Sequence, residues 1–200
     1  MLIEHQGSRP RVAPSAYVAP TAVVCGDVLV GPACRILFGA VVVAEGGAVE
    51  LGEQAIVMEQ ALVRGRAGHP AVVGRHSLVG PHAHVNGAVL GEAVFLATGA
   101  SVFPGARVGA GAEVRINGVV HVNTALPEGA VVPIGWVAVG DPARILPPAA
   151  HDQIWAVQCQ LDFVGTVYGI EPAAPAAEMA AITGGYAELF GRHRDDRVVG

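Results

Sequence analysis

The sequence is poor in charged and aromatic side chains. Only 14% of its 200 residues are Asp, Glu, Lys or Arg, and only 5% are Phe, Trp or Tyr, although 52% are hydrophobic. A core of this composition must be built from small aliphatic side chains, mainly Val and Ala. A surface with so little charge is also one that other subunits can cover.

Several other features are missing, and each absence excludes a class of protein. The three cysteines, Cys25, Cys34 and Cys159, show no CxxC spacing, so neither a disulfide framework nor a zinc ribbon is expected. No basic segment precedes an apolar one at the N-terminus, and the apolar run at 36–44 is too short to span a bilayer. The net charge is −5, without an arginine-rich run, which argues against nucleic acid as a partner. We therefore expect a cytoplasmic protein that binds no membrane.

What the sequence does contain is a repeat. The 27 glycines and 14 prolines indicate many turns, and between them an aliphatic residue recurs every six positions. A small residue often follows four positions later, as at Ala40 and Ala61. The recurring aliphatic residues are Val18, Val24, Val30, Ile36 and Val42, then Leu51, Val57 and Val63, then Val73, Val79 and Val85, and finally Leu90, Leu96, Val102, Val108, Val114, Val120, Leu126 and Val132.

This period predicts an all-β fold, a left-handed parallel β-helix of hexapeptide repeats. Each hexapeptide forms one short strand and one turn, and three of them close one triangular rung. The aliphatic residue points into the prism and the small residue fits the corner. A sandwich of short strands is a poorer explanation, because its turns come every 8–12 residues or so.

The period fails after Arg144, and Pro147-Pro148 interrupts the chain. We therefore divide the chain into a β-helix at 1–146 and a C-terminal α-helical tail at 147–200, packed on the β-helix. Helical spacing in the tail predicts two short helices. Their apolar faces comprise Ile154, Trp155 and Leu161 in one helix and Met179, Ile182, Tyr186, Leu189 and Phe190 in the other.

Three departures from a plain hexapeptide repeat make the chain resemble the γ-class carbonic anhydrases. They are the extended segment at 41–45, the loop at 65–71 and a five-residue step from Val85 to Leu90. The resemblance covers roughly residues 10–165. Hexapeptide acyltransferases share the prism but usually lack this five-residue step.

The resemblance implies a homotrimer in which three histidines hold zinc between subunits, and the zinc-bound hydroxide attacks CO2. In this chain the three ligand positions are occupied by Arg64, Pro81 and Asn86. The family's Arg-Gly-Asp corresponds to residues 43–45, Val-Ala-Glu, and its Asn-x-Gln-Asp to residues 56–59, Ile-Val-Met-Glu. Guanidinium and proline do not bind zinc, so CO2 hydration of the usual kind is not expected.

Two groups of residues near the altered positions are candidates for other chemistry. His82 and His84 would project from one face of an extended segment, and with His69, across a subunit interface, they form a candidate zinc site. The alternative is that these histidines are metal-free and hydrogen-bonded. Arg64, with Glu45, Glu59 and Asn86, forms either a pocket for an anion or carboxylate or an inter-subunit salt bridge that replaces the metal.

These observations leave three hypotheses of function. The first is a carbonic anhydrase-like lyase with a rearranged metal site. The second is a transferase or hydrolase that binds acyl-CoA thioesters as small-molecule ligands in the inter-subunit cleft, with His121 as a candidate base. The third is a non-catalytic trimeric scaffold, which the loss of the usual ligands favours.

Overall fold

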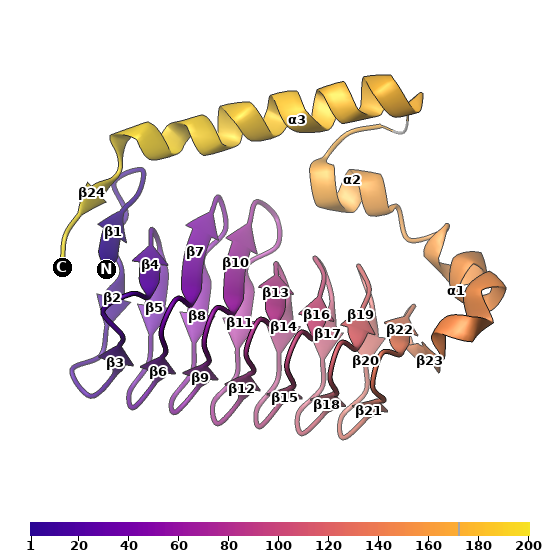
Figure 1. The fold of residues 1–200 in the computed structure, drawn as a ribbon, viewed down its shortest axis with the longest axis horizontal. Coiled ribbons are helices and arrows are strands. Elements are labelled where there is room, and N and C mark those ends of the chain that lie inside the picture. Colours follow the sequence, from indigo (N-terminus) through magenta and orange to yellow (C-terminus); the bar gives the residue numbers. More distant parts are fainter. Residues whose placement is uncertain (172) are drawn as a thin grey trace.

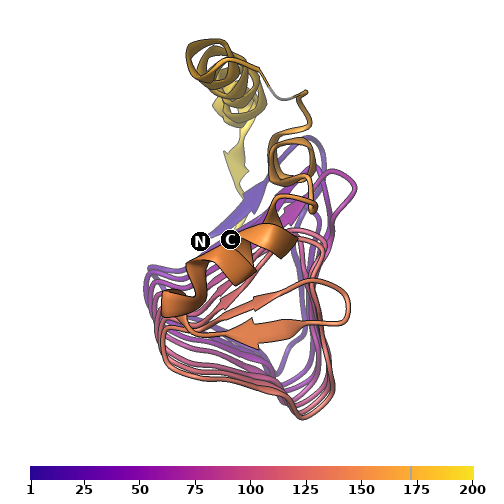
Figure 2. The same cartoon turned by 90° about the vertical axis from the view of Figure 1, so that its right-hand side faces the viewer.

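The computed structural model of the protein describes residues 1–171 and 173–200. Its main body is a triangular coil of short strands (Figures 1 and 2). The coil has three faces, and each face is a β-sheet whose strands stack in sequence order from one rung to the next, except that the last strand of the chain lies beside the first. The left-handed hexapeptide β-helix that the sequence predicts is confirmed.

The first sheet has ten strands, which are β1 (Leu2–Glu4), β4 (Val23–Cys25), β7 (Val41–Glu45), β10 (Leu62–Arg66), β13 (His84–Asn86), β16 (Ser101–Val102), β19 (Val119–Val120), β22 (Val137–Val139), β23 (Arg144–Leu146) and β24 (Arg197–Val198). The second sheet comprises β2 (Arg11–Val12), β5 (Val28–Val30), β8 (Val49–Leu51), β11 (Ala71–Val73), β14 (Val89–Leu90), β17 (Arg107–Val108) and β20 (Ala125–Leu126). The third sheet comprises β3 (Tyr17–Val18), β6 (Arg35–Ile36), β9 (Ile56–Val57), β12 (Leu78–Val79), β15 (Phe95–Leu96), β18 (Glu113–Val114) and β21 (Val131–Val132).

The repeating aliphatic residues set the register of all three sheets. Val63 of β10, for example, pairs with Val42 on one side and with Val85 on the other. These side chains point into the prism, and Ile36, Leu90 and the valines of the series around them are fully buried. Cys34 is also fully buried at a corner position, as expected for a small core residue. The parallel pairing between rungs satisfies the backbone groups of each short strand.

The tail has one more helix than the sequence predicts. After the 3-10 turn η1 (Pro148–Ala150) come α1 (His151–Gln158), α2 (Phe163–Tyr168) and α3 (Pro175–Gly191). The extra helix is α2, whose N-cap residue Asp162 accepts a hydrogen bond from the Gly165 N–H. Helical periodicity does not reveal a helix this short. In the described part of the chain, no helix has both the length and the apolar character needed to cross a membrane.

The tail turns back along the prism. Helix α1 lies across the end of the coil next to β22, and α3 then runs back above the first sheet toward the N-terminus (Figures 1 and 2). A second 3-10 turn, η2 (Arg192–Asp195), leads into β24, which pairs antiparallel with β1. The sequence gives no sign of this last strand. Its consequence is that the two chain termini lie side by side (Figure 1).

Candidate functional site

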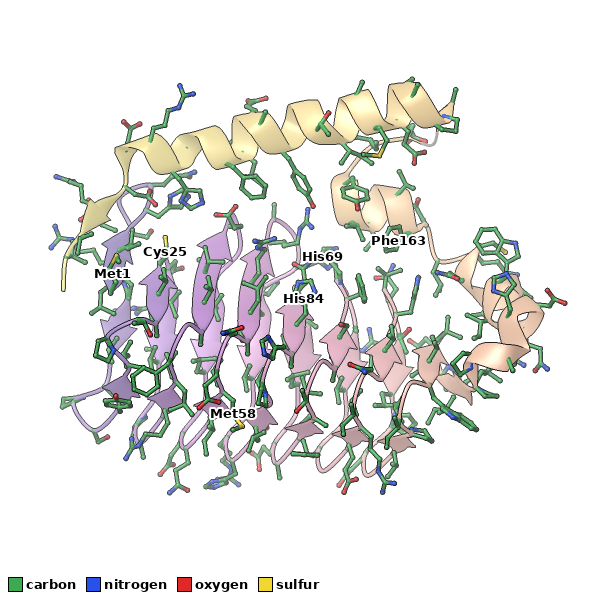
Figure 3. All side chains as sticks on the ribbon, in the orientation of Figure 1. Met1, Cys25, Met58, His69, His84 and Phe163 are labelled. Atoms are coloured by element: carbon green, nitrogen blue, oxygen red, sulfur yellow. The ribbon has the colours of Figure 1, made fainter. Side chains whose placement is uncertain are left out.

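The outer face of the first sheet, beneath the tail, carries most of the polar groups that could act on a ligand. Strand register places an outward residue of each rung in one column, next to the inward aliphatic series. Cys25, Arg64, Asn86 and His121 stand in this column, and His84 stands in the neighbouring one. Cys25 and His84 both project from the sheet toward the tail (Figure 3).

Besides Glu45 Oε2, four polar atoms along this face are buried and make no hydrogen bond in the described structure. They are Arg64 Nε, His84 Nε2, Asn86 Oδ1 and His121 Nδ1. A buried polar atom without a partner costs about 1–3 kcal/mol of stability, so a row of them is rare in a native fold unless something else binds there. We call these four residues the polar row.

Two histidines of the polar row are held in the neutral form at neutral pH. Burial, together with the charges of Arg64 and Arg66, lowers the pKa of His84 below its ordinary value of 6.5. Burial likewise lowers the pKa of His121. Gln158 of α1 places its Nε2 2.8 Å from His121 Nε2. If the amide donates, the neutral ring carries its proton on the unpartnered Nδ1.

Aromatic side chains from the tail cover the polar row. Phe163 of α2 packs against Phe103 and His121, with ring centroids 6.2 and 5.7 Å apart. The Arg64 guanidinium lies against the Phe190 ring of α3, with Arg64 Cζ 5.8 Å from the ring centroid. Helix α3 packs only loosely on the sheet, however, because none of its residues is buried.

A pocket of about 230 Å³ opens at the end of this face nearest the N-terminus. Its floor is apolar, formed by valines of β4 and β7 with Ile3, and its walls carry Glu45, Arg64 and Phe190. The remaining polar groups on the walls are Cys25, His193 and Asp196. Arg64 therefore belongs both to the polar row and to an open pocket.

The residues that the sequence singles out for anion binding are only partly brought together. Arg64 and Asn86 are register neighbours on β10 and β13, and Glu45 lines the same pocket as Arg64. Glu59 lies instead in the turn before β10, where its backbone carbonyl accepts from the His82 N–H. Within the described residues Arg64 makes no ion pair.

The three histidines proposed as metal ligands do not converge within one chain. His82 adopts φ +56° in a turn and β13 begins only at His84, so the extended segment that would align the two is not formed. His69 lies on a loop, with its Cβ close to the position that a Cβ on Gly87 would take. In the described residues these histidines belong to no group of three or more metal-type side chains. A site completed by a neighbouring subunit stays a prediction.

A different polar cluster escaped the sequence analysis. His5 and Cys25, at the ends of β1 and β4, meet His193 and Asp196 of the tail. Asp196 lies 2.6 Å from His5 Nδ1 and 2.7 Å from His193 Nδ1, and His193 Nε2 lies 2.6 Å from Glu45. Burial and the Asp196 carboxylate raise the pKa of Cys25 to about 12, so the thiol is no nucleophile in this state. The hexapeptide series of the sequence begins only at Val18, so it does not place His5 near Cys25, whereas the structure does so by pairing Ile3 with Cys25.

Comparison with known proteins supports the fold and leaves the family open. No family model matches the sequence, and no curated protein is significantly similar to it. The structure is similar to the UDP-N-acetylglucosamine acyltransferase of Francisella novicida, at 14% identity, over 96% of this chain and 90% of that one, with a TM-score of 0.54. At this identity the likeness shows only a shared hexapeptide-repeat left-handed β-helix.

Two further solved structures superpose too loosely to carry a functional argument. One is a hexapeptide transferase family protein from Anaplasma phagocytophilum, with 18% identity over 97% of both chains and a TM-score of 0.40. The other is PerB from Caulobacter crescentus, solved with CoA and GDP-perosamine. It is 28% identical over 68% of this chain and 56% of its own, with a TM-score of 0.45. A membership in the carbonic anhydrases finds no support in these comparisons.

Proposed function

We propose that the protein binds an acyl-CoA thioester over the first sheet and transfers its acyl group to a small acceptor. The polar row is the observation that carries this proposal. It consists of a cation and three neutral polar side chains, and each has a buried polar atom without a hydrogen bond. A ligand with an anionic part and a carbonyl group would provide the missing partners. The prism shared with the Francisella acyltransferase is compatible with such chemistry but does not specify it.

Each residue of the polar row has a role in this reaction. Arg64, at the mouth of the pocket, binds an anionic group of the CoA moiety. His121 lies on the far side of Phe103 from His84, so its Nδ1–H donates to a polar group of the ligand away from the reacting carbonyl. His84 is neutral and takes the proton of the attacking amine or hydroxyl group, while Asn86 Oδ1 orients that group. The C–S bond breaks, the new C–N or C–O bond forms, and the proton passes to the departing thiolate.

His121 is covered by Phe163 of α2, whereas Arg64 becomes accessible to a ligand when α3 moves off the sheet. This movement exposes little apolar surface, because no residue of α3 is buried. The aromatic contacts of Arg64 and Arg66 with Phe190 and Tyr186 would open at the same time. The tail thus acts as a cover that a bound thioester can replace.

The test is a panel of acyl-CoA thioesters, screened first for thermal stabilisation and then for thiol release with amine and hydroxyl acceptors. Arg64→Ala should weaken binding at least tenfold, and His84→Ala should lower turnover by about 10²-fold or more. Arg75→Ala is the matched control, because Arg75 is exposed and pairs with Glu92 away from the first sheet. If no thioester stabilises the protein, or if Arg64→Ala and Arg75→Ala behave alike, the proposal is wrong.

A second candidate function is the carbonic anhydrase-like lyase. It is favoured by the register of Arg64 with Asn86, since the resemblance assigns zinc ligands to these two neighbouring positions. Neither side chain provides the imidazole that such a site needs. We therefore predict no CO2 hydration of the usual kind, which stopped-flow assays with added zinc will test. Strong activity that survives the loss of both His82 and His84 would contradict this prediction.

Failure of both activities would favour the third hypothesis, a non-catalytic trimeric scaffold. The polar row would then be matched by a protein partner instead of a substrate. A cytoplasmic location is part of each of these proposals and is tested by fractionation of the source cells.

A further inference from the structure

The cluster that joins the tail to the first rungs has the composition of a metal site. His5, Cys25, His193 and Asp196 each offer one ligand atom, and all four atoms lie within 4.8 Å of one another. Two imidazoles, a thiolate and a carboxylate are a ligand set that suits zinc. Each ligand comes from the end of a strand or from the turn that leads into β24, so the elements that position them are paired with one another.

We propose that these four residues bind one zinc ion, which fastens the C-terminal tail to the first rungs of the β-helix. This site shares no residue with the polar row, although Cys25, His193 and Asp196 line the same pocket as Arg64, and it does not depend on the proposed acyl transfer. It also differs from the candidate site of His69, His82 and His84, because it shares none of their residues.

The distances in the cluster are close to those that tetrahedral zinc requires. With Zn–O near 2.1 Å and Zn–S near 2.3 Å, the sulfur and oxygen ligands stand about 3.6 Å apart. Cys25 Sγ and Asp196 Oδ2 are 3.7 Å apart. The two contacts between histidine nitrogens and Asp196, at 2.6 and 2.7 Å, must open to about 3.4 Å. These shifts, from 2.6 and 2.7 Å to about 3.4 Å, involve the half-buried tail residues His193 and Asp196.

Glu45 supplies the outer support that zinc-bound histidines usually have. Its Oε1 lies 2.6 Å from His193 Nε2, which leaves His193 Nδ1 for the metal. A carboxylate in this position fixes the ring and increases the basicity of the ligand nitrogen. Glu45 itself is buried, and its Oε2 makes no hydrogen bond in the described structure. Charge also balances, because zinc displaces the thiol proton of Cys25 and meets the single negative charges of Cys25 and Asp196.

The experiment is elemental analysis of protein that is purified without an affinity tag from zinc-supplemented cells. We expect about one zinc per chain in the wild type and in a His82→Ala/His84→Ala control. We expect at least a tenfold loss of zinc in Cys25→Ser and in His193→Gln. His193 lies outside the coil, so His193→Gln tests the site without altering a strand of the coil, even if Cys25→Ser disturbs β4. Cobalt-loaded wild type should show a thiolate-to-cobalt charge-transfer band that Cys25→Ser lacks.

Two results would overturn the proposal. One is wild type that stays metal-free after equilibration with zinc at neutral pH, which would make the cluster a metal-free hydrogen-bonded network. The other is stoichiometric zinc that persists in both Cys25→Ser and His193→Gln. If zinc is lost instead only in the His82→Ala/His84→Ala variant, the site of His69, His82 and His84 is the correct one.

Discussion

At the scale of single residues, the first sheet combines a well-satisfied backbone with unsatisfied side chains. The backbone of β10 and β13 is paired on both sides, yet Arg64, His84 and Asn86 on these same strands each leave a buried polar atom without a partner. Packing alone does not explain this difference, since an apolar side chain at each position would avoid the cost. The residues are therefore better explained by something that binds to them.

The protonation of His84 provides a direct test of this environment. We predict that NMR titration places the pKa of His84 below its ordinary 6.5, because burial and the charges of Arg64 and Arg66 disfavour the imidazolium form. Arg64→Ala should raise the pKa partway toward 6.5, since burial remains. A pKa that does not respond to Arg64→Ala would show that the guanidinium does not face the ring.

The lowered pKa of His84 also makes the free energy of unfolding depend on pH. A histidine whose pKa is lowered by folding contributes stability above about pH 6.5, and this contribution is lost as the pH falls, because the unfolded chain then binds the proton more readily. Between pH 8 and pH 5 the wild type should therefore lose more free energy of unfolding than His84→Gln does. Urea denaturation at the two pH values measures the difference, and an equal or smaller loss in the wild type would contradict it.

At the scale of elements, the hexapeptide period fixes most of the strands but not the tail. Each inward Val or Leu recurs in the same environment on every rung, so local sequence suffices to place β10 or β13. The contacts of the tail, in contrast, join residues that lie far apart in the sequence. Cys25 meets Asp196, and Glu45 meets His193, through a strand, β24, that is only two residues long. No local pattern encodes these pairings, which is why the cluster of His5, Cys25, His193 and Asp196 escaped prediction.

Glycines distinguish the tightly stacked coil from the loosely attached α3. A Cβ on Gly74 would lie 2.2 Å from the Gly91 carbonyl oxygen of the next rung, whereas a Cβ on Gly184 of α3 would meet nothing within 4 Å. Gly74→Ala should lower the free energy of unfolding by roughly 1–3 kcal/mol, because the backbone of the neighbouring rung cannot move aside. Gly184→Ala should stabilise α3 by about 1 kcal/mol, because alanine has a higher helix propensity than glycine.

The two glycine variants are compared by urea denaturation and by limited proteolysis of α3. Gly74→Ala should move the unfolding transition of the coil. Gly184→Ala should slow cleavage in α3 and leave that transition in place, since α3 buries none of its residues. Equal unfolding transitions for Gly74→Ala and the wild type would mean that adjacent rungs are less tightly stacked than the structure indicates.

At the scale of the whole molecule, the three faces of the prism differ in what covers them. The tail covers the first sheet. The outward column of the second sheet runs Arg11, Leu29, Glu50, Val72, Val89, Arg107 and Ala125, and three of these seven residues are charged. The corresponding column of the third sheet is mostly apolar and runs Tyr17, Arg35, Ile56, Leu78, Phe95, Glu113 and Val131. The third column has one charged residue fewer than the second and larger apolar side chains, among them the exposed Tyr17 and Phe95, so we assign the subunit contact to the third sheet.

We predict that three copies of the chain pack their third sheets around a threefold axis. The low charge content and the apolar column favour this face. The γ-carbonic anhydrase resemblance implies only the number of copies, since it would place Arg64 and Asn86 of the first sheet between subunits. Light scattering should give three times the chain mass of 20.3 kDa. Leu78→Glu, in the middle of the column, should yield monomers because a carboxylate would be buried in an apolar contact. Val72→Glu on the second sheet is the matched control and should remain trimeric. A stable wild-type monomer at micromolar concentration would contradict the trimer, and a trimeric Leu78→Glu protein would assign the interface to another face.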